Sequence, residues 1–474
     1  MHFQSTQTRR AFALAPLLFL ALAAAPLNTH AAKGLPNFII IFADDLGYGD
    51  LGCYGNPTIR TPNLDRMAAE GMKFTHFYSA AEVCTPSRAA LLTGRLPIRS
   101  GMASDTRRVL FHNSALGLPP EEITIADGLK TKGYATMCIG KWHLGHLPQF
   151  LPTAQGFDSY FGIPYSNDMD RVTNAPPRAS AVPDPNYEHF NVPLMRDEKV
   201  VERPAVQTTL TKRYTEEALK FIKASKSKPF FLYFPHTMPH VPLFASKDFK
   251  GKSPRGIYGD VVEELDWSVG QILDMLRKEK LAESTLVFFT SDNGPWLIMN
   301  EQGGSAGPLR EGKGSTWDGG MREPGIAWWP GKIKPGVVNH ELASTMDLFA
   351  TCLTLAGVPI PQDRVIDGVD MSPLLFGTGK SNRDVYFYYR GERLFAARKG
   401  WFKAHFQSKS GYGKDPLVKH DPPALYHLGR DPGEKFDVSK DFPDVLADIA
   451  REVERHRDTV TPVKSNLEAV ITKQ

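Results

Sequence analysis

Four segments of this chain share one design, a run of apolar residues that ends abruptly in charged or polar side chains. The runs cover 37–43, 134–139, 230–234 and 286–290. Continuous apolar runs of this length are typical of central strands in a parallel sheet, because such strands are buried on both faces. Helical patterns lie between them, at 63–70, 208–224 and 261–276. This alternation predicts an α/β fold with a central, mostly parallel sheet flanked by helices.

The polar residues that follow the four runs are the first candidates for a functional site. They are Asp44, Asp45, Lys141, His143, His236, His240, Asp292 and Asn293. Ligands of open α/β sheets bind beyond the carboxyl ends of the strands, so we expect these side chains to converge at one edge of the sheet. His236 is set apart, because an isolated histidine of this kind is more often a satisfied structural residue.

The candidates divide into an acidic and a basic set. The acidic set has three carboxylates and one amide oxygen: Asp44, Asp45, Asp292 and Asn293. These are hard ligands of the kind that calcium and magnesium prefer. Either acidic pair alone is as typical of a turn or a helix cap, but two pairs at corresponding strand ends favour a metal site. The basic set comprises Arg88, Lys141, His143, His240 and Lys313. In a water-poor site these groups stabilise negative charge that develops on a substrate.

Residues 84–94 read Cys-Thr-Pro-Ser-Arg-Ala-Ala-Leu-Leu-Thr-Gly. Pro86 suits the first turn of a helix, and residues 89–92 are good helix formers. Cys84 would then lie just before the helix N-terminus, where free N–H groups and the helix dipole favour an oxyanion. A lone cysteine in this position is ordinarily a buried structural residue. The eleven positions taken together indicate a functional one.

This segment resembles, without a mismatch, the signature Cys-x-Pro-Ser-Arg-x-x-x-Leu-Thr-Gly of the sulfatase family. Further segments resemble the arylsulfatase branch, which includes the N-acetylgalactosamine-6-sulfatases, at 51–56, 140–145, 290–295, 319–324 and 428–434. The resemblance covers most of the chain. It implies an alkaline-phosphatase-like fold and the hydrolysis of sulfate monoesters, both aryl sulfates and sugars of the galactosamine or galactose 6-sulfate type.

The resemblance also implies two cofactors. A formylglycine-generating maturation enzyme oxidises Cys84 to formylglycine (3-oxoalanine), whose hydrated aldehyde attacks the sulfur. A calcium ion (Ca²⁺) is bound by Asp44, Asp45, Asp292, Asn293 and the modified Cys84.

The remaining roles follow from the same resemblance. The hydrated aldehyde is held by Arg88, Lys141 and His143. The substrate is held by Lys141, His240, Lys313 and Ser166. Either His240 or Lys313 protonates the leaving alcohol, and His143 assists the release of sulfate.

Two other binding functions are excluded. Residues 307–313 nearly match a Walker A loop, but Gly314 stands where serine or threonine is needed, and no strand leads into the segment. The glycines instead let Lys313 reach an anionic group.

The formal net charge is only +4 over 474 residues, with no Lys/Arg-rich run. We therefore expect no nucleic-acid partner.

Residues 1–31 have the layout of a cleaved export signal. Arg9 and Arg10 precede an apolar run over 11–25, which is too short to span a bilayer comfortably. Both the general secretory and the twin-arginine route fit this segment. We expect a periplasmic or secreted protein without a membrane anchor.

Three cysteines besides Cys84 allow at most one disulfide: Cys53, Cys138 and Cys352.

We predict two structural units after the signal. A catalytic sulfatase domain would cover 33–379. A smaller C-terminal α+β subdomain would cover 380–474, because 384–406 alternate aromatic and polar residues and a charged helical pattern lies around 445–456.

Two alternatives stay open at this level. The chain could be a phosphomonoester or phosphonate hydrolase of the same superfamily. It could also be a non-catalytic, calcium-dependent protein that binds sulfated glycans, if Cys84 is never matured.

Overall fold

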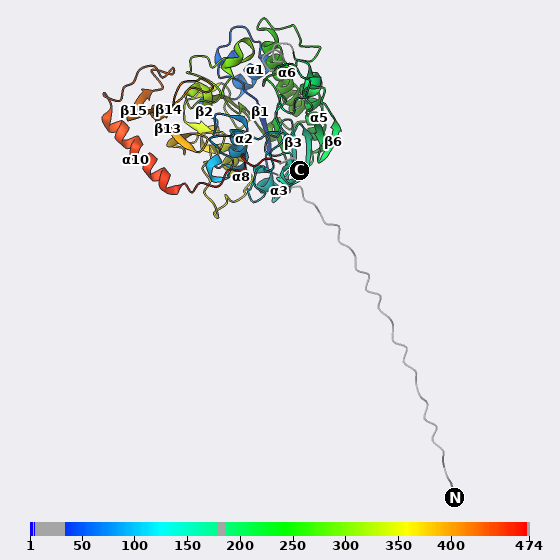
Figure 1. The fold of residues 1–474 in the computed structure, drawn as a ribbon. Coiled ribbons are helices and arrows are strands. Elements are labelled where there is room, and N and C mark those ends of the chain that lie inside the picture. The colour runs from blue at the N-terminus through cyan, green and yellow to red at the C-terminus, as the bar shows by residue number, and fades with distance from the viewer. Residues whose placement is uncertain (3, 5–33, 178–184, 472–474) are drawn as a thin grey trace.

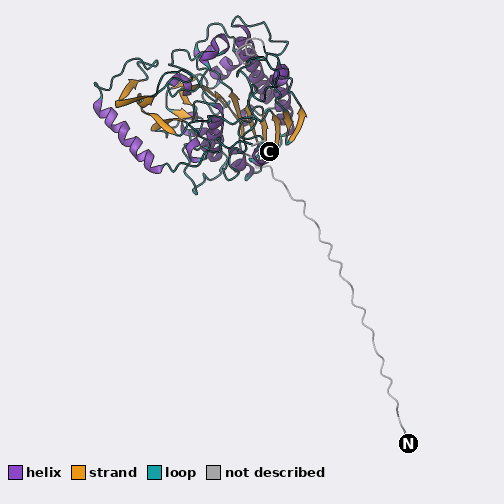
Figure 2. Ribbon diagram, in the orientation of Figure 1, coloured by secondary structure: helices purple, strands orange, loops and turns teal. Residues whose placement is uncertain are grey.

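The computed structural model describes residues 1–2, 4, 34–177 and 185–471. An eleven-stranded sheet with helices on both faces forms the centre, and a four-stranded antiparallel sheet lies beside it near the C-terminus (Figures 1 and 2). The expected α/β fold is therefore confirmed. The expected export signal at 1–31 lies outside the described residues apart from Met1, His2 and Gln4, and it stays a prediction.

The large sheet has the strand order β10-β2-β9-β8-β1-β7-β3-β4-β5-β6, and β11 pairs with β2. Its strands are β1 (Asn37–Ala43), β2 (Met72–Tyr78), β3 (Ala135–Ile139), β4 (Ser159–Gly162), β5 (Leu194–Arg196), β6 (Lys199–Glu202), β7 (Phe230–Pro235), β8 (Thr285–Ser291), β9 (Arg322–Trp328), β10 (Val337–Asn339) and β11 (Ala343–Ser344). The helices are α1 (Pro62–Glu70), α2 (Cys84–Thr93), α3 (Ile125–Lys130), α5 (Leu210–Ala224), α6 (Gly256–Lys278), α7 (Asp318–Met321), α8 (Asp347–Leu355), α9 (Ser372–Leu375) and α10 (Pro443–Thr459).

The four apolar runs form the neighbouring parallel strands β3, β7, β1 and β8, as predicted. Alternate residues of β1 enter two different cores. Ile39 and Ile41 pack with residues of α1, α5 and α6, whereas Ile40 packs with residues of α2, α3 and α8. Burial on both faces explains why each run is continuously apolar. The parallel order breaks at β9, which runs antiparallel to both β8 and β2.

Helix α2 begins at Cys84 itself, with Val83 as its extended N-cap residue. The prediction had placed Cys84 just before the helix, so it was wrong by one residue. Pro86 lies in the first turn, as expected, because a proline there loses no hydrogen bond. The helix is buried along its whole length.

The C-terminal sheet consists of β12 (Val385–Arg390), β13 (Arg393–Lys399), β14 (Phe402–Ser408) and β15 (Val418–His427). Helix α10 covers it, at the left of Figure 1, and its Ile449 and Val453 pack in a core with Tyr386 of β12. A buried ion pair joins this sheet to the rest of the protein, because Lys403 Nζ lies 2.9 Å from Asp318 Oδ1.

All four cysteines are free thiols. Within the described ranges, the helices are too short or too polar to cross a bilayer.

Glu264 in α6 makes the stability of this fold depend on pH. It is only 2% exposed, and its Oε2 accepts the backbone N–H of Ser246 at 2.8 Å. Burial raises the pKa of Glu264 from 4.5 to about 7. Between these values the folded chain holds a proton that the unfolded chain has lost. The free energy of unfolding therefore falls as the pH rises through this window.

The variant E264Q tests this expectation, because glutamine keeps the hydrogen-bond acceptor and removes the titration. Relative to the wild type, E264Q should gain on the order of 3 kcal/mol in the free energy of unfolding as the pH rises from about 4.5 to about 7.5. Urea unfolding of both proteins across this range measures the difference. A difference that does not change with pH would contradict the expectation.

Candidate active site

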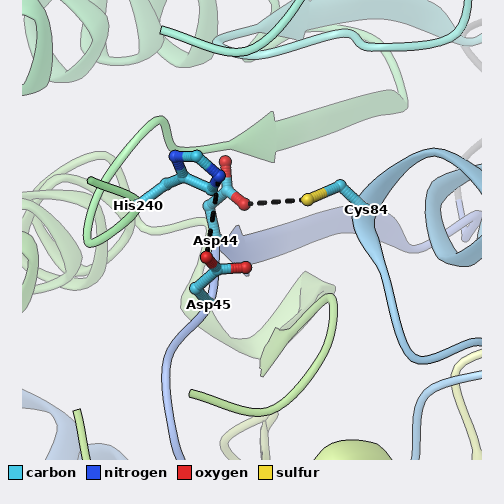
Figure 3. Close-up of side chains that lie close together, drawn as sticks. All are labelled: Asp44, Asp45, Cys84 and His240. Carbon is cyan, nitrogen blue, oxygen red and sulfur yellow. Dashed lines mark hydrogen bonds and ion pairs between the residues drawn. The ribbon is translucent and has the colours of Figure 1, made fainter. Parts of the chain in front are cut away.

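The carboxyl ends of four strands bring the predicted site residues together. Asp44 and Asp45 follow β1, and Asp292 with Asn293 follows β8. Lys141 and His143 follow β3, and His240 lies on the segment after β7. Figure 3 shows how Cys84, at the start of α2, faces Asp44, while His240 faces Asp45. All of these residues are buried.

The acidic residues form one connected group. Asp292 Oδ1 accepts the backbone N–H of Asp45 at 3.0 Å, and Asn293 Nδ2 donates to Asp45 Oδ1 at 2.8 Å. Asp45 has a φ of 63°, a left-handed conformation that is unusual for a residue other than glycine. Burial raises the pKa of both Asp45 and Asp292 above the ordinary value.

Each carboxylate has a cationic partner. Lys141 Nζ lies 2.5 Å from Asp44 Oδ2, and Lys313 Nζ lies 2.7 Å from Asp45 Oδ2. The guanidinium of Arg88 donates from Nε and Nη2 to Asp292 Oδ2, at 3.1 and 2.8 Å. Burial alone would lower the pKa of Lys313, but Asp45 reverses this effect and raises it well above the ordinary value. Three buried carboxylates therefore balance three buried cations.

The oxygen donors of this cluster, from Asp44, Asp45, Asp292 and Asn293, fit a hard divalent cation. Asp44, Asp45, Cys84 and His240 each offer a ligand atom, and these atoms lie within 4.8 Å of one another. The Oδ1 atom of Asn293 is buried and has no hydrogen-bond partner among the described residues, so an amide oxygen is free to coordinate. Carboxylate and amide oxygens are the ligands that calcium and magnesium select.

Cys84 lies between the acidic and the basic groups. Its Sγ is 3.5 Å from Asp44 Oδ1 and 3.6 Å from Lys313 Nζ. Burial raises the pKa of the Cys84 thiol well above its ordinary value, against the opposing effect of Lys141 and Lys313. The unmodified side chain is therefore a neutral thiol at neutral pH.

His143 is positioned as a neutral base. Its Nε2 lies 2.8 Å from the carbonyl oxygen of Leu110, which assigns the ring proton to Nε2. Its Nδ1 is buried and has no hydrogen-bond partner in the described part of the chain. Burial, and next the charge of Lys141, lowers the pKa of His143 well below the ordinary value. The Nδ1 lone pair is therefore available to accept a proton.

Of two further residues singled out in the sequence, one belongs to the cluster and the other does not. Ser166 Oγ accepts from Lys141 Nζ at 3.2 Å, so Ser166 belongs to the cluster. His236 lies outside it, with its ring 4.2 Å from that of Phe234. Neither of its ring nitrogens has a hydrogen-bond partner in the described ranges, and burial lowers the pKa of His236 to about 3. His236 is therefore a neutral packed ring and not the satisfied residue that we expected.

Sequence reasoning missed two aromatic residues at the site. Lys313 Nζ lies 4.4 Å from the ring centre of Trp296, and the Trp296 and Tyr412 rings are 5.4 Å apart. Trp296 follows Asn293 by three residues, so the rule about strand ends would have found it. Tyr412 comes from the loop after β14, where no pattern pointed to the site.

Known proteins similar to this chain belong to one family. The family model "Sulfatase" matches residues 36–358, and the model "C-terminal region of aryl-sulfatase" matches residues 381–474. The chain is 44% identical to N-acetylgalactosamine-6-sulfatase of Canis lupus familiaris, over 95% of this chain and 91% of that protein. It is 43% identical to human arylsulfatase A, over 96% of this chain and 92% of that protein.

Solved structures give the same result. The PsFucS1 sulfatase from Pseudoalteromonas sp. superposes with a TM-score of 0.80 at 31% identity, covering 90% of each chain. The expected alkaline-phosphatase-like architecture is thereby confirmed for the main sheet and its flanking helices.

The candidate metal centre predicts stabilisation by calcium. After dialysis against a chelator, added calcium should raise the Tm. A calcium concentration of about 100 times Kd should raise the free energy of unfolding by about 2.7 kcal/mol. Asp45→Asn should weaken this response because it removes one ligand charge. Asp444→Asn, an exposed change in α10, serves as the matched control. Differential scanning calorimetry measures the shift, and a Tm that ignores millimolar calcium and magnesium would count against a metal centre.

Proposed function

The chain belongs to the sulfatase family, whose activity is the hydrolysis of sulfate esters, and we propose that it acts on sulfated sugars through calcium and a formylglycine made from Cys84. The observation that carries the proposal is the buried cluster in which Cys84 lies between Asp44 and Lys313. The names of the similar proteins favour 6-sulfated N-acetylgalactosamine and aryl sulfates as substrates, and we extend the first of these to galactose 6-sulfate.

The two cofactors supply a hydrated aldehyde as nucleophile and a cation that polarises a sulfate oxygen. We assign the cation to Asp44, Asp45, Asp292, Asn293 and the modified residue 84. The three carboxylates are already balanced by three cations. A bound divalent ion therefore leaves the site positive, which favours an anionic sulfate ester over a neutral ligand.

The protein's own side chains then hold substrate and move protons. Lys141, Lys313 and His240 grip the sulfate, with Ser166 fixing the Lys141 ammonium. The Arg88 guanidinium remains hydrogen-bonded to Asp292 and holds that carboxylate in position. We assign protonation of the leaving alcohol to His240 or Lys313.

His143 acts in the second half of the reaction. Its Nε2 proton is engaged by the Leu110 carbonyl oxygen, so Nδ1 takes up a proton as sulfate leaves. This assignment needs no change of tautomer before the proton arrives.

Maturation and export complete the proposal. A formylglycine-generating enzyme would act on Cys84 before residues 84–93 are buried in α2. The signal-like residues 1–31 would direct the chain to the periplasm or outside the cell, without a membrane anchor. We also propose that 33–379 form the catalytic domain and 380–474 the C-terminal subdomain.

Two other functions remain distinguishable by experiment. A phosphomonoester or phosphonate hydrolase would turn over p-nitrophenyl phosphate or an aryl phosphonate faster than p-nitrophenyl sulfate. A non-catalytic glycan-binding protein would carry an unmodified Cys84 and release no sulfate.

Replacing the proposed nucleophile should abolish turnover. We expect Cys84→Ala to lower kcat on p-nitrophenyl sulfate by on the order of 10³-fold or more, because the covalent route is lost. Cys53→Ala is the matched control, since Cys53 is a half-buried thiol outside the cluster. Mass spectrometry of the wild-type peptide containing residue 84 should detect formylglycine. Sulfatase activity that survives in Cys84→Ala would exclude this mechanism.

A further inference from the structure

The segment that carries Lys313 has little regular structure of its own. Residues 310–317, all of which the structure describes, form neither a helix nor a strand. The segment contains Gly312 and Gly314, and Gly314 has a φ of 86°, in the left-handed region. Glycine gives a chain more conformational freedom than any other residue. The position of the Lys313 ammonium is therefore set largely by contacts that other segments make with this one.

The main domain holds the middle of the segment. The backbone N–H of Lys313 donates to the carbonyl oxygen of Pro295 at 2.9 Å, and that of Gly314 donates to Glu82 O at 2.8 Å. Arg108 Nη2 donates to the carbonyl oxygen of Gly314 at 2.9 Å. These three hydrogen bonds attach the segment to the loops that follow β2 and β8. They do not reach either end of it.

Glu434, in the loop after β15, holds both ends. Its side chain is fully buried. Its Oε2 accepts the backbone N–H of Asp318 at 2.7 Å, at the C-terminal end of the segment. Its backbone carbonyl oxygen accepts from Arg310 Nη1 at 2.8 Å, at the N-terminal end. One residue therefore joins the two ends, with Lys313 between them.

Lys403 of β14 fixes the Glu434 carboxylate and the segment at once. Its Nζ lies 3.0 Å from Glu434 Oε1. The same ammonium donates to the carbonyl oxygen of Thr316 at 2.8 Å and to Asp318 Oδ1 at 2.9 Å. An ammonium group has three donors, so these contacts use all of them. The C-terminal sheet is thus hydrogen-bonded to the segment at two consecutive turns of its backbone.

A stack of side chains adds to these hydrogen bonds. The ring of Trp317 lies 4.2 Å from that of His405 in β14, and the Arg310 guanidinium lies 3.7 Å from the centre of the Trp317 ring. Burial lowers the pKa of His405 to about 4, so its ring is neutral at neutral pH. Its Nε2 lies 2.8 Å from Glu434 Oε1 and carries the ring proton, because a carboxylate only accepts. Arg310 and Trp317 are therefore held to each other and to the C-terminal sheet.

We propose that Glu434 is a positioning residue for sulfate binding, which acts through Lys313 by holding both ends of the segment 310–318. The inference rests on the proposed function, because that function assigns Lys313 to the sulfate. Glu434 acts through the backbone, since its side chain binds the N–H of Asp318 and the side chains of Lys403 and His405. The C-terminal sheet is then required for substrate affinity as well as for stability.

The variant Glu434→Gln tests the proposal, because glutamine keeps the size of the side chain and removes the charge that holds Lys403. The substrate is p-nitrophenyl sulfate, whose leaving group is stable without a proton, so the grip on the sulfate is measured by KM. With calcium at saturation we expect KM to rise about tenfold and kcat to change less than about twofold. Isothermal titration calorimetry with inorganic sulfate should show a Kd about tenfold higher.

Two further variants separate positioning from stability. Arg310→Ala removes an exposed side chain and leaves the buried carboxylate with its partners, so it tests the same contacts if Glu434→Gln does not fold. It should raise KM about threefold. Val453→Ala, in the core between α10 and the C-terminal sheet, is the control. It should lower the Tm and leave KM unchanged, because it does not touch the segment.

Two results would overturn the proposal. The first is an unchanged KM in Arg310→Ala and in folded Glu434→Gln, since the contacts with Pro295 and Glu82 would then suffice. The second is an equal rise of KM in Val453→Ala, which would make the effect one of general stability. The proposed function fails separately, if the wild type contains formylglycine yet does not hydrolyse p-nitrophenyl sulfate. The Kd values for inorganic sulfate then still test the role of Glu434.

Discussion

The mutual neutralisation of buried charges at the carboxyl edge of β1 and β8 is the constraint on which this structure depends. Asp44, Asp45 and Asp292 are almost fully buried, and isolated carboxylates in such surroundings would cost several kcal/mol each. Lys141, Lys313 and Arg88 offset this cost only because each is held at hydrogen-bond distance. The carboxylates are therefore held in place by their cationic partners, and loss of one partner leaves an uncompensated buried charge.

A second set of buried ion pairs joins the C-terminal sheet to the segment that carries Lys313. Lys403 of β14 bridges Asp318 at 2.9 Å and Glu434 at 3.0 Å, and Glu434 Oε2 accepts the backbone N–H of Asp318 at 2.7 Å. Asp318 begins α7, directly after the segment that carries Lys313. A sheet far along the sequence thus fixes the backbone that follows Lys313. The loop after β14 also carries Tyr412, whose ring lies 5.4 Å from that of Trp296.

The sequence predicted the four central strands because burial on both faces leaves a local trace, an uninterrupted apolar run. The same runs also predicted where the polar site residues gather, because Asp44 and Asp292 lie at the ends of two of them and the carboxyl ends of parallel strands share one edge of the sheet. Other features leave no local trace. The antiparallel insertion of β9, the loop that carries Tyr412 and the partner of His143 Nε2 all depend on residues distant in the chain. Periodicity and spacing do not report such contacts.

Charge balance determines what the cluster can attract. Asp44, Asp45 and Asp292 each meet a buried cation, so the carboxylates and their partners leave little net charge to draw in a sulfate ester. In the proposed mechanism the attraction for an anion therefore comes from the divalent cation that we assign to the acidic set, which is the physical reason to expect activity to depend on that ion.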